Sequence, residues 1–358
     1  MRIKTVFIDD NQDDLQKYKE KFEEDERTKN LFNIIPISEN KIEKIKEEIK
    51  KENPDLLLMD FDLTKPIGDI CIGISGVALS VELRESFQEI PIVLFTRKDV
   101  FNIETYPSRI KLVLDGIVYK SDVFIDNSKN INSLYELASG FKKLREVQSK
   151  DWINLIKTIN APNIDYEMLK LSNPPIAQDG KWSISEATNW LRNILFKYPG
   201  ILYDPIHSAT FLGITCDSFL DEAVQKFFTL AKYSEVFNPP EGRWWKSKLQ
   251  EIAESIMNNE EKDLFTNEGF PLAWERKSKK QIERSKCIYR GESPAECVCY
   301  ILKKPVKIKY SLSYKPDSRP SVMDEARVSF KAIRESNEVN DELFNSLGQE
   351  MLKDIRKI

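Results

Sequence analysis

The sequence of 358 residues contains almost no histidine. His207 is the only one, which excludes a histidine-rich metal centre and a phosphohydrolase site built on paired histidine and aspartate residues. The sequence also has no apolar run of about 18 residues and no apolar signal segment near its start. It therefore predicts neither a membrane-spanning helix nor a secretory signal.

Cysteine is scarce, and its residues are scattered and odd in number. The five are Cys71, Cys216, Cys287, Cys297 and Cys299. Such a set favours a reducing, cytoplasmic location over a disulfide framework. Cys297 and Cys299 lack the paired C-x-x-C spacing of zinc sites, so we expect them in a hydrophobic core.

The overall composition is that of a soluble protein with two domains. The chain is 41% hydrophobic and 31% charged, which provides enough apolar residues for two cores. Its formal net charge of -4 argues against a surface that coats nucleic acid throughout. All six tryptophans follow residue 151, and strand–helix alternation stops near 146–151. We therefore expect domains at 1–148 and 149–358.

The most informative pattern is a series of apolar segments that each end in a polar side chain. The segments and the residues that follow them are 3–8 with Asp9 and Asp10, 55–59 with Asp60, 90–95 with Thr96, and 114–119 with Lys120. Continuous apolar runs of this length are typical of buried parallel strands. Since ligands bind at the carboxyl ends of such strands, these side chains are expected to converge on one polar site.

The chemistry of this expected site follows from its charges. Clustered carboxylates repel one another unless a cation joins them, and oxygen ligands on rigid strand ends suit Mg²⁺. A carboxylate beside the metal can attack a phosphoryl group. Lys120 and the Thr96 hydroxyl can then hold the phosphoryl oxygens by charge and hydrogen bond.

These residues make the first 148 positions resemble the receiver domain of two-component response regulators. The resemblance implies that Asp60 is the phosphoacceptor and that Asp9 and Asp10 bind Mg²⁺, together with the backbone carbonyl of Asp62. It also implies that Thr96 is the switch hydroxyl and that Lys120 pairs with the phosphoryl group. The alternative is a degenerate receiver that has kept only the fold.

Three features depart from the receiver pattern. Residues 65–75 look like an insertion beside the active site, so the glycine that usually follows the acceptor is matched by Gly76. Ser121 follows Lys120 where the family often has proline. Ile117 occupies the aromatic switch position, and Tyr119 lies on the other face of the strand. These differences put the usual threonine-to-aromatic relay in doubt. They do not argue against phosphorylation itself.

The predicted fold class of 1–148 is α/β, a doubly wound, flavodoxin-like parallel sheet of five strands that includes a strand at 32–37. Helices are expected at 13–24, capped by Asn11, around Ile42, Ile45 and Ile49, at 77–84 and at 134–147. The second part is expected to be mainly helical, with a β-hairpin near 287–314. Its expected helices are 183–198, 217–237, 239–257, 323–335 and 339–358, and its strands are 296–302 and 306–314.

Three features of the second part are candidates for function. Segment 276–315 carries twelve basic and three acidic residues with interleaved tyrosines, a pattern that can bind nucleic acid or simply form a solvated face. Arg243-Trp244-Trp245, expected early in a helix, is a candidate interface patch, although core packing suits at least one of the tryptophans. His207 is expected to be packed rather than catalytic.

The sequence therefore predicts a cytoplasmic response regulator. A histidine kinase would donate a phosphoryl group to Asp60, and the second part would respond through a protein partner or through a homodimer formed by the first. Three alternatives remain: a phosphorylation-controlled regulator that binds nucleic acid through 276–315, an effector enzyme of a defence signalling system, and a phosphate sink without output.

Overall fold

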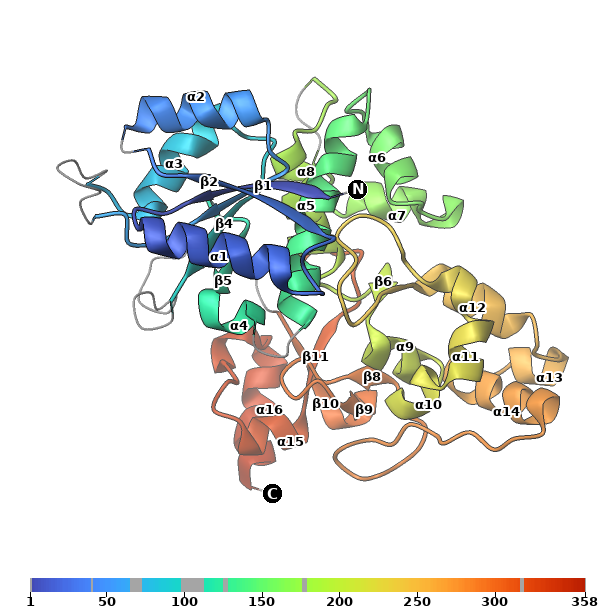
Figure 1. Ribbon diagram of the computed structural model, residues 1–358. Coiled ribbons are helices and arrows are strands. Elements are labelled where there is room, and N and C mark those ends of the chain that lie inside the picture. Colours follow the sequence, from blue (N-terminus) through green and yellow to red (C-terminus); the bar gives the residue numbers. More distant parts are fainter. Residues whose placement is uncertain are drawn as a thin grey trace. The chain divides into compact units, whose positions relative to one another are not determined.

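The computed structural model describes residues 2–39, 41–64, 73–97, 113–124, 128–175, 179–315 and 319–357. The chain divides into two compact units (Figure 1). The first consists of Met1–Lys150 with Trp182–Thr188, and the second of Asp151–Lys181 with Asn189–Ile358. Within the described ranges, no helix has both the length and the apolar character that crossing a membrane requires.

The first unit is built on a parallel sheet of five strands. These are β1 (Ile3–Ile8), β2 (Phe32–Ile37), β3 (Leu56–Met59), β4 (Ile92–Thr96) and β5 (Gly116–Tyr119). Their order is β2-β1-β3-β4-β5, and every neighbouring pair is parallel. This is the flavodoxin-like order, in which the connections place helices on both faces. The predicted fold class of this region is confirmed.

Five described helices accompany the sheet: α1 (Gln12–Glu24), α2 (Ile42–Glu52), α3 (Gly76–Ser86), α4 (Lys120–Phe124) and α5 (Ser128–Glu146). Successive strand residues point to opposite faces. Ile45 of α2 and Leu83 of α3 share a buried cluster with Leu57 of β3. Phe7 of β1 instead packs edge-on against Tyr18 of α1. Both faces of the sheet are therefore buried, which explains the continuous apolar runs of its strands.

Two local features shape the carboxyl end of this sheet. The Asn11 side chain accepts hydrogen bonds from the backbone N–H groups of Asp13 and Asp14, so it caps α1 as predicted. Gly76 begins α3, where an added Cβ would lie 1.9 Å from the backbone oxygen of Asp60. Only glycine permits this approach of α3 to the end of β3.

The second unit is mainly helical. Its helices are α6 (Trp152–Thr158), α7 (Tyr166–Leu171), α9 (Pro205–Phe211), α10 (Cys216–Leu220), α11 (Glu222–Phe227), α12 (Lys246–Glu254), α13 (Asn259–Lys262), α14 (Thr266–Ser278), α15 (Phe330–Glu335) and α16 (Ser346–Lys357). Helix α8 (Ile184–Trp190) spans the boundary between the units and is followed by a π-helical turn, Leu191–Leu195. Tyr198 and Gly200 lie beyond this turn, so the helix expected over 183–198 ends earlier than predicted.

Three antiparallel strand pairs complete the described part of this unit. They are β6 (Leu202–Tyr203) with β7 (Trp244–Trp245), β8 (Cys297–Val298) with β9 (Pro305–Val306), and β10 (Ser311–Tyr314) with β11 (Ala326–Ser329). One apolar cluster joins α9, α12 and α14 around Trp244. Another lies between the last two strand pairs and helices α15 and α16.

Several predicted elements of this unit are wrong in detail. The helix expected over 217–237 is divided, because Asp221 ends α10 and its carboxylate caps α11. Residues 326–329, expected in a helix, form β11, which buries Val328 and pairs with β10. The hairpin around Lys303 is confirmed in β8 and β9, but the strand expected over 306–314 is divided between β9 and β10.

Candidate functional site

The carboxyl end of the first sheet brings together three of the predicted polar side chains, Asp9, Asp60 and Lys120. The Lys120 ammonium Nζ lies 2.7 Å from Asp9 Oδ2 and 2.9 Å from Asp60 Oδ1. The Lys120 and Asp9 side chains are each 2% exposed. Lys120 follows β5, Asp9 follows β1 and Asp60 follows β3, so the parallel register of the sheet brings them to one edge.

Burial makes this a site of strong electrostatic coupling. Desolvation raises the pKa of the Asp9 carboxyl to about 6, against the lowering effect of Lys120, and the nearby Asp60 charge raises it further. Burial alone lowers the pKa of the Lys120 ammonium, but the Asp9 and Asp60 carboxylates outweigh that effect and raise it. A buried carboxyl whose pKa lies far above its usual value is typical of a functional site.

Backbone hydrogen bonds hold both carboxylates in place. The Asn11 N–H donates to Asp9 Oδ1 at 2.9 Å, and the Asp62 N–H donates to Asp60 Oδ2 at 3.0 Å. The Asp60 N–H continues the sheet ladder by donating to the Ile8 carbonyl. Each carboxylate therefore has one oxygen held by a backbone N–H and the other paired with Lys120.

The remaining predicted residues lie at the same strand ends. Asp10 follows Asp9 and is 7% exposed, and Asp60 is 8% exposed. Thr96 ends β4, between the strands that carry Asp60 and Lys120, and is 1% exposed. Its Oγ1 has no hydrogen-bond partner in the described part of the chain. A buried hydroxyl without a partner is costly, so this atom is suited to a ligand that supplies one.

One residue of the site was missed in the sequence. Asp14 Oδ2 lies 3.4 Å from Lys120 Nζ, which gives the lysine a third carboxylate. Asp14 lies four residues after Asp10, and α1 begins at Gln12. Because Asp10 precedes the helix, the helical spacing of the two acids could not have indicated this contact.

The donor atoms suit Mg²⁺ in type. Asp9, Asp10 and Asp60 supply carboxylate oxygens, the ligands this cation prefers, and a cation would stabilise the ionised form of the buried Asp9 carboxyl. Among the described residues, however, no three acidic, histidine or cysteine side chains already form a metal-binding group. Lys120 provides the positive charge between Asp9 and Asp60. The magnesium site therefore stays a prediction.

Comparisons with known proteins extend this description. No protein-family model and no curated protein matches the sequence. Among solved structures, the chain is similar to the response regulator TrrA from Thermotoga maritima, solved in complex with Mg²⁺ and BeF, at 20% identity. The match covers 37% of this chain and 99% of that one, with a TM-score of 0.28.

Two further matches are of the same kind. A signal receiver domain from Bacteroides fragilis is 22% identical over 38% of this chain and 98% of its own, with a TM-score of 0.29. A response regulator receiver domain from Clostridium thermocellum is 17% identical over 40% and 98%, with a TM-score of 0.30. The matches cover the N-terminal part of the chain, and they concern the fold alone.

Only some of the departures from the receiver pattern fall on residues that the structure describes. Most of the expected insertion, residues 65–72, lies outside the described residues. Ile117, at the usual aromatic position, packs against the cluster formed by α2, α3 and the sheet. Tyr119 lies two residues further along β5, in register with Thr96, so it shares the face of Ile117. Its predicted place on the other face of the strand is therefore wrong.

Two candidate features of the second unit prove to be structural. Trp244 is 1% exposed and Trp245 3% exposed, so the interface patch predicted from Arg243-Trp244-Trp245 is wrong. These residues form β7 instead of starting a helix, because β7 pairs with β6 in the interior. Cys299 is fully buried, and Cys297 packs against the same apolar cluster, as predicted.

The basic segment 276–315 is less positive in the fold than in the sequence. Four of its twelve cations form ion pairs with acids inside and outside the segment: Arg276 with Glu261, Arg284 with Glu275, Lys307 with Glu296, and Lys309 with Glu292. Tyr314 is 3% exposed and packs against Phe344, so it cannot stack on a base. Nucleic-acid binding through this segment stays a prediction, and these contacts weaken its support.

Proposed function

We propose that the chain is a phosphorylation-switched response regulator in which Asp60 accepts the phosphoryl group. The observation that carries the proposal is the buried ammonium of Lys120, within 2.9 Å of both Asp9 and Asp60 at the carboxyl edge of the sheet. An ammonium at this place would pair with a phosphoryl oxygen once Asp60 is modified. Thr96 Oγ1, which has no hydrogen-bond partner among the described residues, would donate a hydrogen bond to a second phosphoryl oxygen.

The transfer itself needs positioning and charge neutralisation more than acid–base chemistry. The Asp60 carboxylate forms a bond to phosphorus as the P–N bond of a phosphohistidine donor breaks, and the electron pair of that bond goes to the leaving imidazole. The Asp62 N–H keeps the Asp60 carboxylate oriented. Lys120 holds the negative charge that gathers on the phosphoryl oxygens.

Asp9 and Asp10, with Asp60 and the Asp62 carbonyl, would hold Mg²⁺. When bound, this cation supplies positive charge that offsets the repulsion between the carboxylates and the incoming phosphate. The structure supports this role through the residue types and the raised pKa of Asp9. The position of Lys120 between the two carboxylates implies that its ammonium shifts toward the phosphoryl group upon modification.

The consequence of phosphorylation is a change in what Lys120 and Thr96 contact. Phosphorylation adds up to about two negative charges beside them. Drawing both groups inward would reorder the ends of β4 and β5, the surface through which a homodimer or a protein partner would sense the switch. The donor is a histidine kinase, and the location is the cytoplasm that the scattered cysteines predict.

The test is phosphoryl uptake by the full chain. Incubation with acetyl phosphate and Mg²⁺ should add the mass of one phosphoryl group, detected by intact-protein mass spectrometry, and chelation with EDTA should prevent it. Asp60→Asn should show no gain, because the amide is not a nucleophile of this kind. Asp13→Asn is the matched control, since Asp13 is exposed in the first turn of α1 and should leave uptake unchanged.

Uptake that persists in Asp60→Asn would assign the acceptor role to another residue. A chain that takes up no phosphoryl group from acetyl phosphate, and none from any histidine kinase tested, would point to the degenerate receiver.

A further inference from the structure

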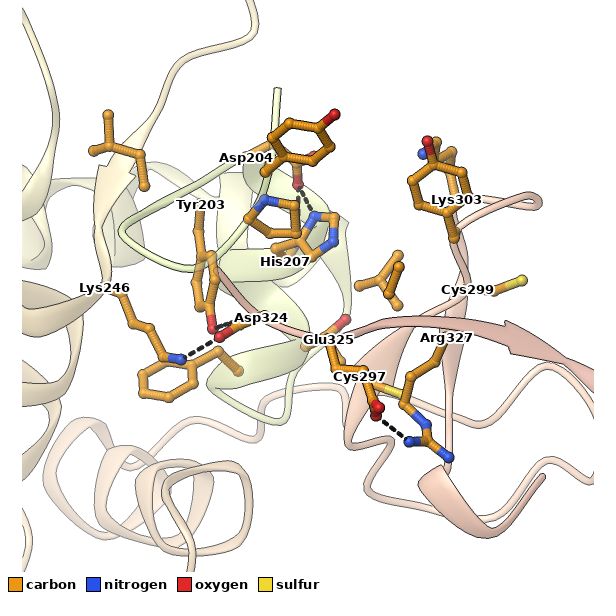
Figure 2. Close-up of a pocket in the computed structure, with 18 of the residues that line it drawn as sticks. Tyr203, Asp204, His207, Lys246, Cys297, Cys299, Lys303, Asp324, Glu325 and Arg327 are labelled. Atoms are coloured by element: carbon orange, nitrogen blue, oxygen red, sulfur yellow. Dashed lines mark hydrogen bonds and ion pairs between the residues drawn. The ribbon is translucent and has the colours of Figure 1, made fainter. Parts of the chain in front are cut away.

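The second unit contains a cavity of about 600 Å³ that no predicted role explains. It is lined by β6 and the loop before it, by α9 and the start of α12, and by strands β8 and β11 with the loops beside them. Figure 2 shows their side chains facing one another across the space. Its volume lies within the range of small-molecule sites, roughly 300–1,000 Å³.

One wall of the cavity is aromatic. The rings of Tyr203 and Phe211 lie 5.7 Å apart, and Lys246 Nζ lies 5.2 Å from the centre of the Tyr203 ring. Lys246 also forms an ion pair with Asp324 at 2.8 Å, and the Tyr203 hydroxyl donates to the same carboxylate. The charges on this wall are therefore balanced. Tyr203 is 4% exposed, so the partly exposed Phe211 ring is the one that offers a surface to a planar ligand.

The only histidine of the chain faces the same space. His207 Nδ1 lies 2.8 Å from Asp204 Oδ1, which also accepts the His207 backbone N–H and so caps α9. Burial raises the pKa of the Asp204 carboxyl, but the hydrogen bonds from His207 outweigh this and lower it to about 2. Because the ionised Asp204 accepts a hydrogen bond from Nδ1–H, Nε2 of the neutral imidazole is left as an acceptor for a ligand hydroxyl.

The cavity also carries positive charge that its own acids do not neutralise. Three of the four acidic side chains of the lining have a cationic partner: Glu296 with Lys307, Asp324 with Lys246, and Glu325 with Arg327. Lys303 and Arg319, which also line it, form no ion pair among the described residues. Lys303 Nζ lies over the Tyr300 ring at 4.4 Å.

Arg319 is the most informative of these side chains. Its Nη1 is buried and has no hydrogen-bond acceptor among the described residues. Guanidinium N–H groups are strong donors with no acceptor capacity, and leaving one buried and unpaired costs free energy. The buried Thr210 Oγ1, in the same lining, also lacks a partner. A ligand with acceptor oxygens would satisfy both.

We propose that this cavity binds a nucleotide, a ligand that joins a planar ring to a sugar and an acidic phosphate. The Phe211 ring receives the base, and His207 Nε2 accepts a hydrogen bond from a sugar hydroxyl. Arg319 and Lys303 hold the phosphate. This site stands on the second unit alone, so it does not depend on phosphorylation of Asp60.

The test is isothermal titration calorimetry of the full chain with AMP, GMP, UMP and ATP. Adenosine and inorganic phosphate are titrated separately, because adenosine carries only the ring and sugar and phosphate carries only the anion. At least one nucleotide should bind at micromolar concentration, and more tightly than adenosine or phosphate by about tenfold or more, since charge-assisted hydrogen bonds and ring contacts add. Equal binding of phosphate and nucleotide would overturn the proposal.

Variants locate the binding. Arg319→Gln and His207→Gln should each weaken nucleotide affinity by about tenfold. Arg334→Gln should not, because Arg334 is exposed on α15 and lies outside the lining. Lys303→Gln, at an exposed side chain, keeps the test valid should Arg319→Gln fail to fold, and it should also weaken binding. No nucleotide binding at millimolar concentration, or full affinity in these variants, would refute the site.

Discussion

Two lysine–aspartate pairs of almost equal length occupy very different surroundings in the two units. Lys120 lies 2.7 Å from Asp9, and both side chains are 2% exposed. Lys246 lies 2.8 Å from Asp324, with side chains 31% and 36% exposed. By distance alone, the two pairs would contribute equally to stability. Their different burial makes the contributions unequal, because desolvation raises both the free-energy cost of the charges and the strength of their attraction.

The difference bears on the ligand that we propose for each site. In the first unit the buried carboxylates need the Lys120 charge, so any group that joins them, cation or phosphoryl, changes the balance at once. In the second unit the pair at the cavity is screened by water and leaves the unpaired cations, Lys303 and Arg319, to act on a ligand. The first arrangement suits a switch, and the second suits a binding pocket.

The largest effect is expected from removing the buried lysine. Lys120→Met leaves Asp9 and Asp60 without their counter-charge and should lower the free energy of unfolding by about 3–5 kcal/mol. Lys246→Met should lower it by less than about 1 kcal/mol, because its partner Asp324 remains solvated. Urea unfolding in EDTA near neutral pH, followed by circular dichroism, measures both. Equal losses would remove the contrast between the two pairs.

The next effect concerns pH. The pKa of Asp9 rises from 3.8 to about 6, so the folded state binds this proton more tightly than the unfolded state. The free energy of unfolding should therefore fall as pH rises through this window, by at most about 1.4 kcal/mol per unit of pKa shift. Asp9→Asn should remove this component, whereas the exposed Asp13→Asn should retain it. Unfolding curves at a series of pH values without Mg²⁺ test the difference, and identical profiles for Asp9→Asn and the unmodified chain would contradict it.

The smallest effect is expected at two buried threonines. Thr96 Oγ1 and Thr210 Oγ1 both lack partners among the described residues. Replacing either residue by valine removes an unsatisfied hydroxyl and should change the free energy of unfolding by no more than about 1 kcal/mol. Only Thr96→Val should abolish any change in self-association that acetyl phosphate causes, as measured by gel filtration. A response that survives in Thr96→Val would separate this residue from the switch.

The first unit could be read from its sequence in considerable detail. Apolar runs in the sequence indicate the strands, and a parallel sheet places the residues after those runs at one edge. Asp9, Asp60 and Lys120 therefore lie together as predicted. Asp14 was missed, because its role depends on how α1 is turned toward Lys120.

The second unit could be predicted only in outline. Asp221 divides a helix that apolar periodicity alone would continue, and Val328 lies in a strand because a partner strand is available. Trp244 and Trp245 have the composition of an interface patch, yet both are buried. Local sequence carries no information on which distant segment will cover such residues.

What the sequence by itself determined is the order of elements in the first unit and the identity of the polar groups at its edge, because the period of a strand and the polarity of its end are local properties. Only the tertiary structure decided the burial that shifts the pKa of Asp9, and only it brought His207, Lys303 and Arg319 to one cavity. These residues come from segments far apart in the chain. Their meeting depends on the packing of apolar surfaces between them, which no short stretch of sequence encodes.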